Sequence, residues 1–108
     1  MKSLKEIQSE QKLWMDSNFP GTNSIEQFLG VVEEVGELSH ALLKLSQGIR
    51  GKPSKLREDS MDAVGDIMIF LMGFCNEMQW DLDTILNTTW DHVAKRNWVN
   101  NPLTGEEN

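Results

Sequence analysis

The side chains of this chain that are best suited to chemistry are acidic and occur in two short motifs. Glu33, Glu34 and Glu37 lie in the run EEVGE, and Asp62 and Asp66 lie in the later run DAVGD. On a helix that turns by about 100° per residue, Glu33 and Glu37 point about 40° apart, and Glu34 and Glu37 about 60° apart. The spacing therefore predicts that each motif presents its carboxylates on one side of a helix.

Asp66 is the only charged residue in the segment 64–75, which otherwise holds apolar residues and glycine. A buried carboxylate without a partner costs on the order of several kcal/mol, so we expect Asp66 to have a cation, an arginine or a proton as its partner. Two interpretations are open. The acids of both motifs converge on a divalent cation, or they form a solvated acidic face with ordinary salt bridges to Lys44, Arg50 or Arg57.

The ligand chemistry of the motifs favours Mg²⁺, with Mn²⁺ as a substitute. Mg²⁺ takes oxygen ligands and keeps waters and phosphates in its shell, whereas no cysteine and no histidine pair lies near the acids to favour zinc. His40 follows Glu37 at the acid-x-x-His spacing of di-iron bundles, but those bundles need the motif twice, and His92 has no Glu three residues before it. An all-carboxylate magnesium site indicates phosphate chemistry, in which the metal neutralises phosphates and activates a water, while a spare glutamate accepts its proton.

Helical periodicity runs through almost the whole chain, with little strand-like alternation. The apolar spacing predicts four helices, at about residues 3–17, from Asn23 or Ser24 to Gly48, from about 56–60 to about 79, and from Asp81 or Asp83 onward. Four helices with short connections indicate an all-α fold, a four-helix up-down bundle that forms a single domain over residues 1–108 with a flexible tail from about residue 100. The third helix is apolar on more than one side, so we expect it to be central and buried, and the bundle to be completed by a homo-oligomer.

The composition excludes several classes of protein. With 17 acidic and 10 basic residues and a formal charge of −7, the chain is poorly suited to gripping nucleic-acid phosphates. Cys75 is the single cysteine, which excludes an intrachain disulfide and a cysteine-rich zinc site. The longest apolar run, Ile67–Cys75, is far shorter than the roughly 20 residues of a membrane span, and no signal peptide is recognisable. We therefore expect a cytoplasmic protein that binds neither nucleic acid nor membrane.

The two acidic motifs together resemble those of the MazG-like nucleotide pyrophosphohydrolases, in which a Glu-Glu-x-x-Glu motif precedes an acid-x-x-Asp motif on the next helix. The resemblance covers most of the chain, including the segments Lys12–Trp14, Asn18–Pro20, Gln47–Gly51 and Val93–Trp98. It implies an all-α NTP pyrophosphatase fold and an Mg²⁺-dependent enzyme that hydrolyses a (d)NTP between the α- and β-phosphates, giving (d)NMP and pyrophosphate. It also implies a homodimer or homotetramer whose sites are completed across subunits, and a role in removing unwanted nucleotides.

The resemblance further implies roles for the acids. The catalytic set would be Glu33, Glu34 and Glu37, and the matching metal ligands are Glu34, Glu37 and Asp66. Glu33 would hold or deprotonate the attacking water, or support the metal shell. The family has glutamate three residues before the aspartate, where this chain has Ala63. Asp62 lies one helical turn before Asp66 and faces nearly the same direction as Asp66, so we assign it the role of the fourth ligand.

Seven further residues are candidate substrate-binding residues. Trp14 can stack on a base, which contributes about 1–3 kcal/mol, although its place in an apolar stripe also fits a core residue. The basic loop after the second helix can close over phosphates as a lid or only offset the acidic charge. The basic cluster near the C-terminus can reach phosphate or base, or only complement a helix dipole. The residues concerned are Lys52, Lys55 and Arg57 in the loop and Lys95, Arg96 and Asn97 near the C-terminus.

Two functions of other classes remain open at this level. One is a catalytically silent helical interaction module that uses the acids to hold a structural ion. The other is a di-metal redox bundle, which the single acid-x-x-His spacing makes the weaker alternative.

Overall fold

A computed structural model of the chain describes residues 1–106. In this range the chain forms four helices and no strand: α1 (Leu4–Asn18), α2 (Ser24–Gln47), α3 (Pro53–Met78) and α4 (Leu82–Val93). The expected all-α class is therefore confirmed for the described residues. None of these helices combines the length and the apolar character that crossing a membrane requires.

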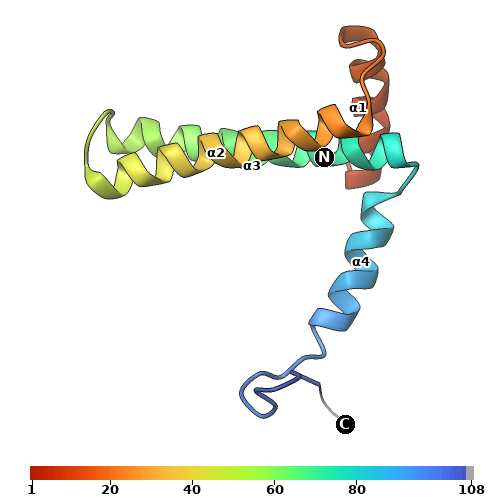
Figure 1. The fold of residues 1–108 in the computed structure, drawn as a ribbon, viewed down its shortest axis with the longest axis vertical. Coiled ribbons are helices and arrows are strands. Elements are labelled where there is room, and N and C mark those ends of the chain that lie inside the picture. Colours follow the sequence, from red (N-terminus) through yellow and green to blue (C-terminus); the bar gives the residue numbers. More distant parts are fainter. Residues whose placement is uncertain (107–108) are drawn as a thin grey trace.

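The long helices α2 and α3 lie side by side and run in opposite directions, joined by the turn at residues 48–52 (Figure 1). At the other end of this pair, α1 lies across α3, and α4 leaves in a different direction. Within one chain the four helices thus form an antiparallel pair, one helix that crosses its end and one that leads away, and the expected bundle completed by oligomerisation stays a prediction.

The helix boundaries follow from local signals at each end. Ser3 caps α1 in a capping box with Glu6, and the Asn23 side chain caps α2 by accepting the Glu26 amide. Gly48 ends α2 in the left-handed conformation, at φ 70°. The start of α3 is earlier than the expected residues 56–60, because a proline is compatible with the first turn of a helix, where its missing N–H is not needed.

Polar side chains fix the position of α1 against the end of α3. Gln8 on α1 donates to Asn76 on α3 at 2.9 Å, and Asn76 donates to Gln11 at 2.9 Å. The Gln8 side chain also accepts the backbone N–H of Leu82 at 3.0 Å, which satisfies a free donor at the start of α4. These bonds surround the small buried core of Met72, Cys75 and Leu82 and hold three helices at one junction.

Two glycines let α2 and α3 approach closely. A Cβ atom at Gly30 would overlap the Phe70 ring, and one at Gly73 would overlap the side chains of Gln27 and Gln11. Glycine within a helix costs about 1 kcal/mol relative to alanine, so its presence at both positions is explained by this packing. The close approach brings the middle of α2 against the middle of α3, where both acidic motifs lie.

The expectation that the third helix is central and buried is wrong for a single chain. Met61 is 69 % exposed and Val64 is 52 % exposed, because α3 packs against α2 on one face and only its end meets α1. The segment expected to be a flexible tail forms a hydrogen-bonded loop, in which Asn97 N–H donates to Gly105 O at 2.7 Å and the Trp98 ring lies against Gly105. Residues 107–108 of that segment lie outside the described part.

Candidate metal centre

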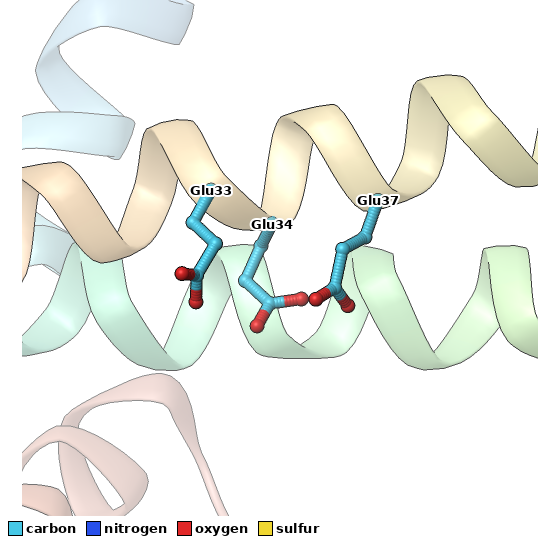
Figure 2. A group of neighbouring side chains, drawn as sticks. All are labelled: Glu33, Glu34 and Glu37. Atoms are coloured by element: carbon cyan, nitrogen blue, oxygen red, sulfur yellow. The ribbon is translucent and has the colours of Figure 1, made fainter.

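Three carboxylates of α2 form a compact cluster. Glu33, Glu34 and Glu37 each offer an oxygen, and these oxygens lie within 4.8 Å of one another. Figure 2 shows the three side chains leaving α2 on the same side, with the carboxyl groups of Glu34 and Glu37 adjacent. This is the arrangement that helical spacing predicts for the first motif. The oxygens are close enough for one divalent ion to share them.

Glu34 differs from its neighbours in being buried. It is 8 % exposed, and its Oε2 atom has no hydrogen-bond partner among the described residues. Burial raises the pKa of the Glu34 carboxyl, and the negative charges of Glu37 and Asp66 raise this pKa further. A buried oxygen of this kind is costly unless a cation or a proton satisfies it. The donor set therefore fits a hard divalent cation.

The second acidic motif faces the first across a polar cavity. Glu37 from α2 and Asp62 and Asp66 from α3 line this cavity, whose volume is about 460 Å³. The register of the antiparallel pair produces this meeting, since the two motifs lie near the middle of their helices. Asp62 and Asp66 are not part of the close cluster of Glu33, Glu34 and Glu37, and they share only the wall of this cavity with Glu37.

The expectation that Asp66 is buried inside an apolar helix is wrong for a single chain, because Asp66 is exposed. Asp66 lies three residues after the buried Ala63, at the edge of the contact between α2 and α3. The acid that is buried with an unpartnered oxygen is Glu34, through its Oε2 atom. Apolar neighbours along the sequence cannot reveal this difference, because exposure depends on which face of the helix each residue occupies.

An apolar cavity adjoins the same acids on the other side. It has a volume of about 410 Å³, and its wall includes the aromatic rings of Trp14, Phe19 and Phe70. Glu34 and Asp66 also line it. Trp14, a candidate for base stacking, is 52 % exposed and packs against Phe19 with ring centroids 6.0 Å apart. The Trp14 ring therefore forms part of the wall of this cavity and is partly exposed, so Trp14 is not a core residue.

The candidate phosphate-binding cations near the start of α3 lie outside the wall of the polar cavity. Lys55 pairs with Asp59 at 2.8 Å, and neither Lys55 nor Lys52 nor Arg57 lines the polar cavity. Lys44 donates to Gln47. Within residues 1–106 the other ion pairs are Lys2–Glu10 and Lys12–Asp16, so the clustered acids form no salt bridge with a lysine or arginine.

The basic cluster near the C-terminus does not meet the acids within one chain. Lys95 and Arg96 line a separate cavity of about 320 Å³ together with His92 and Glu106. The backbone of Asn97 closes the loop onto Gly105. Because α4 leads away from the middle of α2 and α3 (Figure 1), these residues could reach an acidic cluster only if it belonged to another copy.

Two residues at the site, Phe19 and Phe70, escape sequence reasoning, and they line the apolar cavity. Arg50 and His40 line the polar one, although the sequence suggests Arg50 only as a salt-bridge partner and His40 only as an iron ligand. Phe19 and Phe70 look like ordinary apolar positions, and only the contact between distant segments places them at a cavity. For Arg50 a signal exists, since it is the basic residue held between Gly48 and Gly51 in the turn that follows the first acidic motif.

A comparison of the chain with protein-family models, with curated proteins and with solved structures finds no match.

Proposed function

We propose that the chain is an Mg²⁺-dependent nucleoside triphosphate pyrophosphohydrolase similar to the MazG-like enzymes. It would hydrolyse a (d)NTP to (d)NMP and pyrophosphate, and act in removing unwanted nucleotides in the cytoplasm. The observation that supports this most is the position of the acids between two unlike cavities. Asp66 lines both cavities, Glu34 lines the apolar one and Glu37 the polar one. A nucleotide has the same division, with a flat base at one end and charged phosphates at the other.

The side chains have separate tasks in this reaction. Trp14 stacks on the base in the apolar cavity. Glu34, Glu37, Asp62 and Asp66 would hold Mg²⁺, which would neutralise the phosphates and lower the pKa of a water. Glu33 accepts the proton of the attacking water as its oxygen bonds to phosphorus. The bond from phosphorus to the bridging oxygen breaks, and pyrophosphate leaves with that electron pair.

A homo-oligomer is part of the proposal, because a single chain leaves an unusual amount of apolar surface uncovered. The accessible surface is 8098 Å², about 2,000 Å² more than the roughly 6,100 Å² expected of a folded monomer of this length. The radius of gyration is 17.5 Å, against about 13 Å for a compact domain. The excess area is that of an obligate interface. A second copy would also bring Lys95, Arg96 and Asn97 within reach of the acids.

We expect the substitution Leu42→Glu to dissociate this oligomer. Leu42 is 49 % exposed and lies in a row with Val35 and Phe28, each seven residues apart and each about half exposed. A charge in the middle of an apolar interface is unfavourable. Light scattering after size-exclusion chromatography should give a dimer or tetramer for the unaltered chain and a smaller species for the variant. Leu103→Glu, at a 95 % exposed loop position, should change nothing. A folded monomer from the unaltered chain would contradict the proposal.

The direct test is pyrophosphate release from a panel of common and damaged (d)NTPs with Mg²⁺ or Mn²⁺. We expect release from at least one of them, and none when the metal is chelated. If every triphosphate remained intact, the enzyme proposal would be wrong. Thermal melting then identifies the alternative, a silent metal-binding interaction module, in which metal raises the melting temperature and a triphosphate adds nothing further.

A further inference from the structure

The arginine of the turn between α2 and α3 lines the polar cavity that the acidic motifs share. Arg50 lies on its wall together with Glu37, Asp62 and Asp66. No other arginine and no lysine of residues 1–106 lines this cavity. A single arginine therefore shares the wall of a cavity of about 460 Å³ with several carboxylates.

Arg50 does not neutralise these carboxylates. The ion pairs formed within residues 1–106 involve Lys2, Lys12 and Lys55, and none involves Arg50. Within the described residues the Arg50 side chain forms no hydrogen bond with α2, α3 or the turn between them. Its five N–H donors are thus available to a ligand in the cavity. A guanidinium binds phosphate oxygens in a two-pronged manner that lysine cannot reproduce.

The backbone holds this arginine in an uncommon conformation. Arg50 has φ 64°, in the left-handed region, and follows Gly48, whose φ is 70°. A residue other than glycine is uncommon in this region and costs about 1 kcal/mol or more there. Asparagine would fit this backbone more easily than arginine. The turn therefore has an arginine at a position whose backbone conformation does not favour this residue type.

We propose that the Arg50 guanidinium binds the β- and γ-phosphates in the polar cavity, and so selects triphosphates and holds the leaving pyrophosphate. This inference rests on the proposed function for the identity of the substrate. The acids of the cavity would hold the metal, and Arg50 would contact the two terminal phosphates. When the bond between the α-phosphorus and the bridging oxygen breaks, its electron pair stays on pyrophosphate, and Arg50 stabilises that added charge.

The test compares Arg50→Asn and Arg50→Lys with the unaltered chain. Asparagine removes the charge and tolerates the positive φ, so the turn is preserved, and circular dichroism with thermal melting verifies folding. Titration calorimetry with inorganic pyrophosphate and Mg²⁺ should show an affinity about tenfold to a hundredfold lower for Arg50→Asn, and a smaller loss for Arg50→Lys. Affinity for a nucleoside monophosphate should stay the same. Lys44→Gln removes a charge near the same turn outside both cavities and should leave pyrophosphate binding unchanged.

The outcomes separate this inference from the proposed function. If triphosphates are hydrolysed and Arg50→Asn binds pyrophosphate as well as the unaltered chain, Arg50 has no phosphate role, while the enzyme proposal stands. If no triphosphate is hydrolysed but pyrophosphate binds in an Arg50-dependent manner, the phosphate site stands and the enzyme proposal fails. If the unaltered chain does not bind pyrophosphate with Mg²⁺, the inference is overturned. A loss of stability in Arg50→Asn without any loss of pyrophosphate affinity would show that the arginine only balances charge.

Discussion

Replacing Glu37 by glutamine or Asp66 by asparagine should reduce pyrophosphate release by at least about a hundredfold. Both carboxylates line the polar cavity, and neither is engaged in a salt bridge within residues 1–106. Loss of a metal ligand removes several kcal/mol of transition-state stabilisation, and each 1.4 kcal/mol or so corresponds to a factor of ten in rate. The measurement is the rate of pyrophosphate release from the best substrate at saturating Mg²⁺.

A second measurement separates metal loss from unfolding. Glu37 and Asp66 are exposed, and their charges repel that of Glu34, so the amide variants should melt at the temperature of the unaltered chain or above it when metal is absent. Their affinity for Mn²⁺, followed by its paramagnetic resonance signal, should fall. Glu77→Gln on α3 and Asp91→Asn on α4 are matched controls outside both cavities and should retain activity. Full activity in Glu37→Gln would show that the cluster on α2 is not the catalytic centre.

Much of the site follows from local spacing alone. The proximity of Glu33, Glu34 and Glu37 requires only a continuous helix, and the run from residue 24 to residue 47 provides one. The meeting of Glu37 with Asp62 and Asp66 requires one further condition, an antiparallel pair joined by a short turn. Short connections between consecutive helices favour this arrangement. The acidic wall of the polar cavity was therefore predictable from the sequence.

The positions of α1 and α4 were not predictable in the same way. They depend on Gln8 and Asn76, which lie 68 residues apart and bond to each other, and on the bond of Gln8 to the start of α4. Glutamine and asparagine in a helix are ordinarily exposed polar residues, and nothing local marks these two as buried partners. The aromatic cavity is likewise outside sequence reasoning, because Trp14, Phe19 and Phe70 meet only when α1 crosses the pair.

The substitution Glu34→Gln should have opposite effects on stability with and without metal. Burial raises the pKa of the Glu34 carboxyl, so the folded chain binds its proton more tightly than the unfolded chain does. The contribution of Glu34 to stability therefore falls as the pH rises above the ordinary carboxyl value of 4.5. At pH 8 without metal, the neutral amide should stabilise the chain by on the order of 1 kcal/mol, a rise in melting temperature of about 4–8 °C.

Metal should reverse this order. A cation that binds only the folded chain stabilises it by about 2.7 kcal/mol when its concentration is a hundred times its dissociation constant. Glu34→Gln removes a ligand and should lose most of that gain, so the unaltered chain becomes the more stable of the two in Mn²⁺ or Mg²⁺. Glu77→Gln should show no such reversal in the order of stability.

The pH dependence of the stability difference between Glu34→Gln and the unaltered chain identifies the cause of this reversal. Well below pH 4.5 Glu34 is protonated in the folded and unfolded chains alike, so the metal-free difference between Glu34→Gln and the unaltered chain should disappear there. A variant that is less stable than the unaltered chain at pH 8 without metal would mean that the Glu34 carboxylate already has a partner in the folded protein. In that case the buried oxygen would need no cation, and the strongest structural support for a metal at this cluster would be lost.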